Sequence, residues 1–254
     1  MTIFESVILG IVEGITEFLP VSSTGHLILT SKLLGLQQTN IHKAFEVSIQ
    51  LGSILAVIFL YKERIFHSIE LWKRLIVAFI PTGALGFFLY KIIKNLFSPY
   101  VVSVMLIVGG IIFIIIEKFY KEKEHHIEDI TQVSYLKAFL IGFFQSLAMI
   151  PGTSRSGATI IGGLLLGLKR KAAAEFSFLL AVPTMLVATS YDILKNYNSF
   201  QFGDFVALAV GFLTAFIFAV LTIKLFIRYI SHHNFIPFGI YRIIIGIVFL
   251  LFFL

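Results

Sequence analysis

The sequence contains no cysteine among its 254 residues. This absence excludes disulfide bonds, thiolate catalysis and thiolate metal sites, so any chemistry must use oxygen and nitrogen groups. Charged residues are also scarce, at 13%, whereas hydrophobic residues make up 58% and the mean hydropathy is +0.95. Such a composition excludes an ordinary soluble domain and indicates an all-α polytopic membrane protein.

The chain begins Met-Thr-Ile-Phe-Glu and lacks the basic region and the small-residue cleavage site of a signal peptide. We therefore expect its first hydrophobic segment to belong to the fold. The net charge of +6 is compatible with a nucleic-acid partner, but the basic residues lie in short segments between apolar stretches, as is usual beside anionic lipid. We expect no nucleic-acid binding.

Two hydrophobic segments, about 4–36 and 134–168, are interrupted near their middle by Pro-Val-Ser-Ser at 20–23 and by Pro-Gly-Thr-Ser at 151–154. Each arm has about 14 residues, or ~20 Å, which is too short to cross a hydrocarbon core of roughly 30 Å. We therefore expect two re-entrant helical hairpins, because broken backbone at membrane depth must be buried in protein or line a wet cavity. Six further stretches are long enough to span, approximately 45–61, 72–93, 100–120, 172–194, 204–229 and 236–254.

The two halves of the chain resemble each other. Each half would hold one hairpin and three spans, and three is odd, so the second copy would enter the membrane from the opposite side as an inverted-topology repeat. We expect a single membrane domain over 1–254, with repeat 1 at about 1–120, a charged linker at about 121–132 and repeat 2 at about 133–254. A shift of 132 residues superposes Gly10 on Gly142, Glu13 on Gln145, Gly25 on Gly157 and Gly35 on Gly167, and a one-residue slip then superposes Pro20 on Pro151, Ser23 on Ser154 and Phe45 on Phe176.

Lysine and arginine are unevenly distributed about the expected spans. Of the 20 such residues, Arg155 lies inside the second hairpin and most others, Arg242 included, are expected opposite the termini. The positive-inside rule makes that crowded side cytoplasmic, so both termini and the mouth of the first hairpin would face outward. The tips of the two hairpins are then expected to meet near the bilayer centre. The few basic residues expected on the terminal side are Lys32, Lys43, Lys91, Lys94 and Lys195.

Two carboxylates lie in the first hairpin. Glu13 and Glu17 are spaced i, i+4 and share one helix face about a turn apart. Two oxygen donors at this spacing suit a hard cation such as Mg²⁺ or Ca²⁺. The alternative is a structural pairing of both with Arg155. That pairing would leave one of two anions uncompensated at membrane depth, so the metal site is favoured.

Hydroxyl groups and a histidine follow the carboxylates. Ser22, Ser23 and Thr24 lie where the second arm begins, and helix capping accounts for only one of them. His26 lies about one turn further on and could orient a hydroxyl, act as a general acid or base, or act as the nucleophile. The structural alternative is a buried histidine whose hydrogen bonds are satisfied. Its acidic and hydroxyl neighbours in an apolar segment favour the functional role.

The segment 151–159, Pro-Gly-Thr-Ser-Arg-Ser-Gly-Ala-Thr, is typical of an anion cradle. Gly152 lets the backbone approach a ligand, and the N-terminus of the second arm offers free N–H groups with a positive dipole. Arg155 adds a forked donor that matches phosphate oxygens. Further hydroxyl donors for the same oxygens are Ser154, Ser156 and Thr159.

Acidic metal ligands opposite an anion cradle indicate a site for a phosphorylated or pyrophosphorylated group brought in from the bilayer. At these residues the sequence closely resembles the undecaprenyl-diphosphate phosphatase family, the integral membrane enzymes of bacitracin resistance. The resemblance covers essentially the whole chain. It rests on Glu13-x-x-x-Glu17 leading to Ser-Ser-x-Gly-His26, on the complete motif at 151–159, and on the run 45–52, where Glu46 and Gln50 either line the cavity or satisfy the hairpin backbone.

The resemblance implies hydrolysis of undecaprenyl diphosphate to undecaprenyl phosphate and inorganic phosphate, with a divalent cation, on the outer side of the bacterial cytoplasmic membrane. This reaction recycles the lipid carrier of peptidoglycan precursors. We expect the two glutamates of the first hairpin to hold the metal, and Arg155 with Ser154 and Thr159 to clamp the terminal phosphate. Either Ser23 or a water would attack in line with help from His26, while the polyprenyl tail lies in a lipid-facing groove.

A transporter or lipid flippase is the rival interpretation, because inverted repeats with helices broken at the midplane are a general transporter architecture. Such a protein needs anion and lipid contacts, but it does not need metal-binding carboxylates beside serine and histidine. The acidic cluster therefore favours the enzyme. A homodimer is compatible with a bundle of this size, although no residue argues for it.

Overall fold

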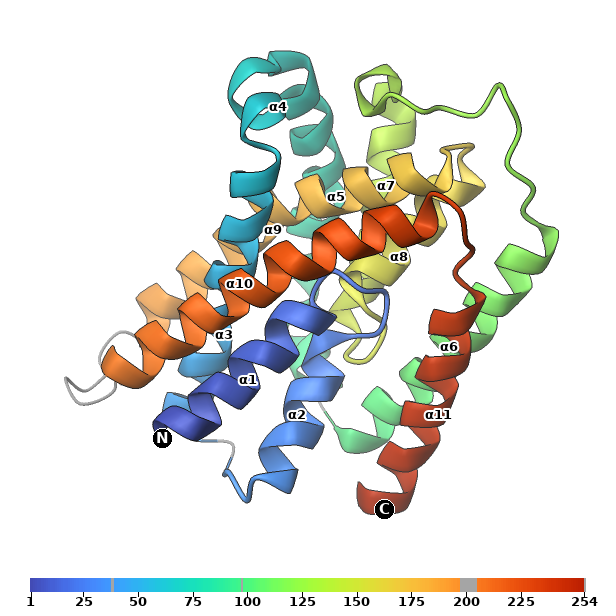
Figure 1. Ribbon diagram of the computed structural model, residues 1–254. Helices are drawn as coiled ribbons and strands as arrows, with labels where there is room; N and C mark the ends of the chain where they lie inside the picture. The colour runs from blue at the N-terminus through green and yellow to red at the C-terminus, as the bar shows by residue number, and fades with distance from the viewer. Residues whose placement is uncertain (38, 97, 197–204, 254) are drawn as a thin grey trace.

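The computed structural model describes residues 1–37, 39–96, 98–196 and 205–253 (Figure 1). No strand lies in these ranges; one isolated bridge joins Ile127 and Leu168. Short 3-10 turns occupy Ile130–Gln132 and Leu147–Met149. The α-helices are α1 (Ile3–Thr16), α2 (Ser23–Leu33), α3 (Asn40–Leu60), α4 (Lys62–His67), α5 (Ile69–Asn95), α6 (Pro99–Phe119), α7 (Tyr135–Ser146), α8 (Arg155–Leu165), α9 (Arg170–Asn196), α10 (Phe205–Ile230) and α11 (Ile236–Phe253).

Four of the described helices, α5, α6, α9 and α10, are long and apolar enough to cross a membrane. Shorter apolar stretches, Phe45–Leu60 and Ile236–Phe252, lie in α3 and α11. These six helices coincide with the six predicted stretches, although residues 204 and 254 of the prediction lie outside the described ranges. The chain is a multi-pass helical membrane protein.

The predicted interruptions of the two remaining segments are confirmed as helix breaks. The first separates α1 from α2 at 17–22, and the second separates α7 from α8 at 147–154. Serine or threonine side chains begin most helices by accepting a hydrogen bond from the backbone, as Ser68 does for Leu71 at 3.2 Å. The six-residue helix α4 was not predicted, because it is too short to show a hydrophobic period.

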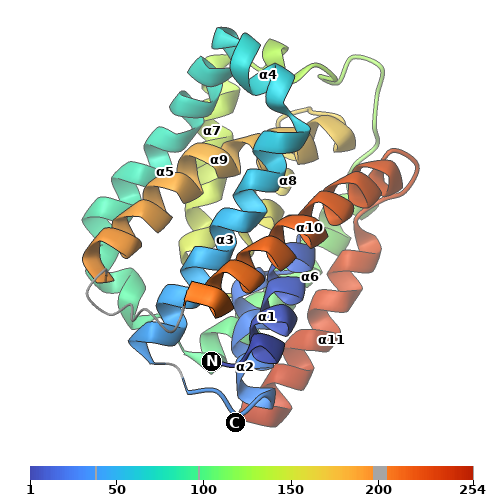
Figure 2. The same cartoon turned by 60° about the vertical axis from the view of Figure 1, so that its left-hand side comes forward.

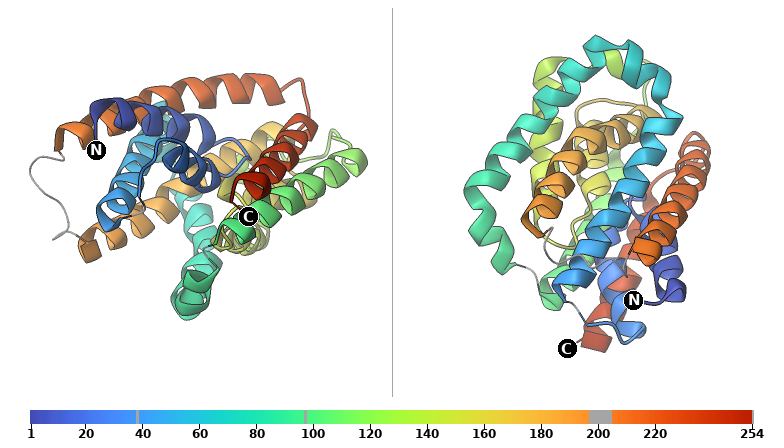
Figure 3. Two further views of the ribbon diagram at one scale, coloured as in Figure 1. Left: turned by 90° about the horizontal axis from the view of Figure 1, so that it is seen from below. Right: turned by 90° about the vertical axis from the view of Figure 1, so that its left-hand side faces the viewer.

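Helices at matching places in the two halves make matching contacts. Helix α1 packs along α10, and α7, its counterpart in the second half, packs along α5. Helix α3 packs against α9, and α6 packs against α11. Figure 2 shows α5 and α9 side by side at one edge of the molecule, and the left panel of Figure 3 shows α6 and α11 paired at another.

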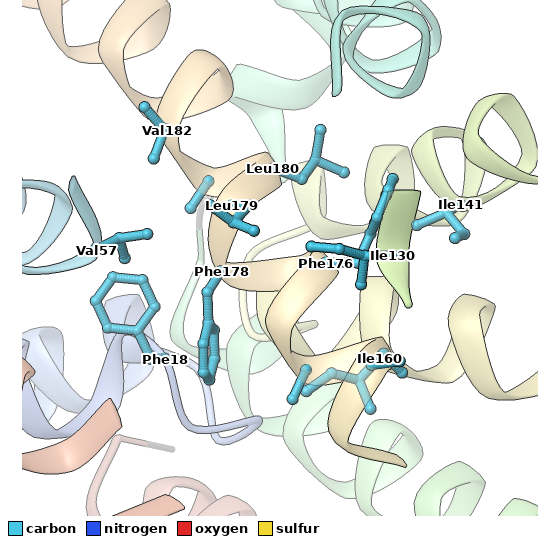
Figure 4. Close-up of a cluster of buried hydrophobic side chains, with 14 of the residues drawn as sticks. Phe18, Val57, Ile130, Ile141, Ile160, Phe176, Phe178, Leu179, Leu180 and Val182 are labelled. Atoms are coloured by element: carbon cyan, nitrogen blue, oxygen red, sulfur yellow. The ribbon is translucent and has the colours of Figure 1, made fainter. Parts of the chain in front are cut away.

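Helix α9 forms the centre of the bundle. Of its apolar stretch 72% is buried, against 22% in α5 and 33% in α6 and in α10. Its run from Phe176 to Val182 packs against both halves, with Phe18, Val57 and Ile160 among its neighbours in the core (Figure 4). The rings of Phe18 and Phe178 meet edge to face at 5.3 Å. The core therefore supports the first helix break directly, because Phe18 follows Glu17.

Both termini lie at the end of the molecule opposite α4 and the segment 121–132 (Figure 1). Basic residues gather near α4, as expected, with Lys62 and Arg64 exposed. One assignment was wrong: Arg242 does not lie on the basic side but inside the protein, with 0% exposure. The side chains of Lys43, Lys91, Lys94 and Lys195, which were assigned to the terminal side, lie outside the described part of the chain.

Glycine allows α1 to approach α10 closely. A Cβ atom added to Gly14 would lie 2.5 Å from the carbonyl oxygen of Ala215 and 2.8 Å from Cβ of Phe218. We expect Gly14→Ala to destabilise the protein by about 1–3 kcal/mol, because the clash forces the two helices apart. Thermal unfolding in detergent measures the effect. The control is Gly86→Ala, where the nearest atom is Sδ of Met149 at 3.7 Å; equal unfolding midpoints for the two variants would refute the packing argument.

Candidate functional site

A cavity of about 720 Å³ lies between the two helix breaks and the helices α5 and α9. Its inner end is polar and is built from both loops. The outer end is apolar and leads to the exposed side chains of Phe87, Val187 and Tyr191, which are 80%, 55% and 56% exposed. The residues of the polar end are Glu17, Ser22, Ser23, Thr24, Gln50, Gln145, Ser154 and Arg155, and those of α5 and α9 toward the mouth include Phe79, Gly83, Gly86, Met185 and Ala188.

The two loops end in the same strained way. Ser22 and Ser154 are the residues before α2 and α8, and their φ angles are +71° and +73°, in the region that favours glycine. Each hydroxyl accepts a hydrogen bond from the glycine three residues on, Gly25 at 3.4 Å and Gly157 at 3.1 Å. Such strain costs about 1–3 kcal/mol and is concentrated at functional sites.

This geometry corrects the predicted alignment of the loops. Ser154 corresponds to Ser22, not to Ser23, so the shift of 132 holds through the end of the loop without a slip. Ser23 and Arg155 are then equivalent residues, each the first of a short helix. Equivalent positions in the two halves thus carry a hydroxyl and a guanidinium.

Glu17 joins these two positions. Its Oε2 accepts a hydrogen bond from Ser23 Oγ at 2.5 Å, and its Oε1 accepts one from Arg155 Nη2 at 3.1 Å. Glu17 is 7% exposed and the Arg155 side chain 12%, so water competes little with this ion pair. The two helix breaks therefore meet, as the sequence predicts.

Arg155 is fixed from two further sides. Its Nη1 donates to the carbonyl oxygen of Ser177 at 2.8 Å, and its guanidinium lies 5.8 Å from the ring centre of Phe18. Its buried Nε has no partner among the described residues. Arg155 also lines the cavity, so its guanidinium can donate to an anionic ligand there.

Not all predicted anion ligands reach the cavity. Gly152 and Ser154 line it. Ser156 instead donates to the carbonyl oxygen of Leu19 at 2.8 Å, and Thr159 donates to Oγ of Ser177 at 2.6 Å. Ser156 and Thr159 are 0% and 1% exposed. They tie α8 to its neighbours, and their predicted role in anion binding stays a prediction.

His26 also points away from the cavity. Its Nδ1 is 2.8 Å from the carbonyl oxygen of Ser22, and its Nε2 is 2.7 Å from the hydroxyl of Tyr241, whose ring lies parallel to it at 5.5 Å. Because a carbonyl can only accept, Nδ1 is the protonated nitrogen and Nε2 accepts from Tyr241. This arrangement holds the strained turn at Ser22. Nothing in the sequence near His26 indicates Tyr241, which comes from α11.

Among the described residues, no group lies within hydrogen-bonding distance and geometry of either carboxylate oxygen of Glu13, which is 0% exposed. It does not line the cavity, and its polar neighbours include the buried Ser53 of α3. Only Glu17 pairs with Arg155, so the alternative in which both glutamates do so is not realised. No group of three or more histidine and acidic side chains that could hold a metal occurs in the described ranges. Two unsatisfied carboxylate oxygens one turn from Glu17 nevertheless fit a hard cation, provided that ligand oxygens complete its shell.

Polar residues that the sequence did not single out line the cavity wall. The side-chain amide of Gln145 donates to Thr82 at 3.0 Å and to Thr184 at 3.1 Å, which joins α7 to α5 and α9. Of the two undecided residues of α3, Gln50 lines the cavity. Glu46 instead contacts His42 Nε2 at 3.0 Å and accepts from Ser31 at 3.2 Å.

The family described as Bacitracin resistance protein BacA matches residues 6–248. The chain belongs to the BacA family. Among relatives named undecaprenyl-diphosphatase, that of Persephonella marina is 73% identical over 252 residues, covering 99% of each chain. Those of Sulfurihydrogenibium sp. and Wolinella succinogenes are 65% and 61% identical, covering 99% and 98% of each chain. The BacA match includes both loops and every residue that lines the cavity.

The two glutamates are expected to affect stability in opposite directions. Glu13→Gln should raise the stability by about 1–3 kcal/mol, because it replaces a buried carboxylate without partners by a neutral amide. Glu17→Gln should lower it by a similar amount, because the charge-assisted bond to Arg155 is lost. Thermal unfolding in detergent gives both values. Loss of stability in Glu13→Gln would mean that this carboxylate has a stabilising partner after all.

Proposed function

We propose that this protein hydrolyses undecaprenyl diphosphate to undecaprenyl phosphate and inorganic phosphate, and so recycles the lipid carrier for peptidoglycan synthesis and confers resistance to bacitracin. The observation that carries the proposal is the cluster of Glu17, Ser23 and Arg155 at the closed end of a cavity whose open end is apolar. The identity of 61–73% to relatives named undecaprenyl-diphosphatase agrees with it. The substrate has the same two parts, a diphosphate and a long hydrocarbon chain.

The terminal phosphate binds at the second loop. Arg155 offers its unpartnered Nε, the side chains of Ser154 and Ser22 line the same space, and the N-terminus of α8 points its dipole there. A phosphate in this place replaces part of the contact between Glu17 and Arg155. Arg155 then stabilises the negative charge on the phosphoryl group as it is transferred.

Ser23 or a water attacks the terminal phosphorus. The 2.5 Å hydrogen bond places Glu17 Oε2 to accept the proton of Ser23 Oγ as the new P–O bond forms. The anhydride P–O bond then breaks, and undecaprenyl phosphate leaves with the electron pair. If Ser23 is the nucleophile, water hydrolyses the phosphoserine and releases phosphate. Both ring nitrogens of His26 are engaged, by the carbonyl oxygen of Ser22 and by the hydroxyl of Tyr241, so His26 supports the reaction by holding the turn at Ser22.

A divalent cation, Mg²⁺ or Ca²⁺, is the proposed cofactor. Glu13 and Glu17 would hold it, and the chemistry that it supplies is neutralisation of charge on the diphosphate oxygens. The buried, unpartnered oxygens of Glu13 support this assignment. Glu17 lines the cavity and Glu13 lies one turn before it on α1, so a cation held by the two would offset the repulsion between these carboxylates and a diphosphate in the cavity.

The polyprenyl chain lies between α5 and α9. Phe79, Gly83, Gly86 and Phe87 recur on one face of α5 at helical spacing and line the apolar end of the cavity. Both glycines leave room at the mouth, and the exposed aromatic side chain beside them faces the lipid. The substrate can therefore enter sideways from the bilayer.

We further propose the topology of the chain in the membrane. The six helices that match predicted spans cross it, and the pairs α1–α2 and α7–α8 re-enter it as hairpins within one domain. Matching packing of α1 on α10 and of α7 on α5, with the equivalent turns at Ser22 and Ser154, supports an inverted repeat. The basic end near α4 is cytoplasmic, so both termini lie on the outer side of the bacterial inner membrane, and the lateral mouth of the cavity lies toward that same side. A homodimer stays a prediction.

The first experiment is phosphate release from a short-chain prenyl diphosphate by detergent-purified protein. Release should require Mg²⁺ or Ca²⁺ and should fall by at least about 10²-fold in Glu17→Ala and in Arg155→Ala, since each removes a charge at the reacting group. Matched controls are Glu63→Ala and Arg228→Ala, whose side chains are exposed far from the cavity. If folded wild-type protein binds prenyl phosphate but releases none, the protein is a lipid transporter instead.

The apolar end of the cavity predicts how activity depends on the length of the polyprenyl chain of the substrate. Gly86→Leu should raise KM for a long polyprenyl diphosphate on the order of tenfold, because the added side chain fills the mouth, and should change kinetics with a C15 substrate little. Gly86→Ala is the control. Equal effects on the two substrates would show that the tail leaves the cavity by another route.

A further inference from the structure

Arg242 is the largest fully buried side chain of the described residues and lies on α11, directly behind the two loops. Its position is surprising for a guanidinium, because no described carboxylate forms an ion pair with it. All its hydrogen bonds go to backbone carbonyl oxygens. Removing a charge from water for carbonyl partners alone is costly, which indicates a specific purpose.

The carbonyl partners come from both loops. Nη1 donates to the oxygen of Pro20 at 3.0 Å, and Nη2 donates to the oxygen of Gly152 at 3.0 Å. Pro20 and Gly152 are equivalent under the shift of 132, two residues before the strained Ser22 and Ser154. Nη2 and Nε also donate to Met105 and Leu106 of α6, at 3.1 and 3.4 Å. One side chain thus ties the matching carbonyls of the two halves to each other and to α6.

The protein makes room for this guanidinium with glycine. A Cβ at Gly109 would lie 2.1 Å from Nη2 and 2.7 Å from Cζ of Arg242, and a Cβ at Gly110 would lie 3.2 Å from its Cβ. Gly110 is the residue that corresponds to Arg242 under the same shift. The first half therefore has a closely packed glycine where the second half has the arginine.

We propose that Arg242 is a positioning residue for the phosphatase reaction, which holds the two loops in register so that Ser23 and Arg155 face Glu17. The inference rests on the proposed function. Arg242 does not line the cavity, so it acts on the substrate only through the loops. Ser23 and Arg155 each lie three residues after a tethered carbonyl. Movement of either loop would separate Ser23, Glu17 and Arg155 from one another, and displacements of about 1 Å cost on the order of 10² in rate.

The test compares Arg242→Met, which keeps much of the volume, with Arg242→Lys and with Gly109→Ala. We expect kcat for a short prenyl diphosphate to fall about 10²-fold in Arg242→Met and by less in Arg242→Lys, whose ammonium still donates to the loop carbonyls. Gly109→Ala should lower kcat because it displaces the guanidinium without removing its charge, and it should add little to Arg242→Met. Arg228→Met, at an exposed arginine of α10, is the matched control and should behave as wild type.

Binding separates positioning from general loss of fold. A prenyl methylenediphosphonate, whose P–C–P link is not hydrolysed, should bind each variant with wild-type stoichiometry and with Kd changed less than about fivefold. If the binding stoichiometry falls in proportion to kcat in Arg242→Lys and Gly109→Ala, then Arg242 only stabilises the fold, and the proposal is overturned. If Arg242→Met does not fold, the results for Arg242→Lys and Gly109→Ala decide whether Arg242 positions the loops. Wild-type kcat in Arg242→Met would overturn the positioning role alone, whereas an inactive wild type would overturn the phosphatase and this role together.

Discussion

The structure depends on finding hydrogen-bond partners for the backbone N–H and C=O groups that two helix breaks leave free where water is scarce. Two helices are interrupted inside an apolar bundle, and each interruption frees donors and acceptors that lipid cannot satisfy. The protein meets them internally: serine hydroxyls cap α2 and α8, Arg155 reaches the carbonyl of Ser177, and Arg242 reaches those of Pro20 and Gly152. The polar site and the support of the loops are consequently one connected network. Its rigidity derives from the surrounding core, above all from α9.

Much of the architecture could be predicted from the sequence because it is encoded in composition and length. Apolar runs located the long helices, and proline with clustered serine located both breaks. The pairing of Glu17 with Arg155 could also be predicted from the sequence. Charged groups at such depth must find partners, and few charges are available there.

The direction of individual side chains could not be predicted in this way. Spacing of i, i+4 places Glu13 and Glu17 on one helix face, and Glu17 still has helical backbone angles, yet Glu17 lines the cavity whereas Glu13 lies beside Ser53 of α3 and does not line it. His26 faces Tyr241, which is 215 residues away in the chain, and Arg242 was assigned to the basic side opposite the termini because nothing in its sequence neighbourhood indicates burial. The apparent slip of the repeat arose from matching prolines and serines by type, whereas backbone conformation pairs Ser22 with Ser154.

The contacts of Glu17 have a consequence for ligand exchange. The two carboxylate oxygens of Glu17 accept hydrogen bonds from Ser23 and Arg155. Glu17 therefore competes with a phosphate for the guanidinium of Arg155. A ligand must compete with that carboxylate for the guanidinium of Arg155. A diphosphate, which carries more negative charge, competes better than a monophosphate. Each turnover reduces the charge on the lipid headgroup. The internal ion pair therefore re-forms more readily over the product than over the substrate, and turnover itself favours release of the lipid.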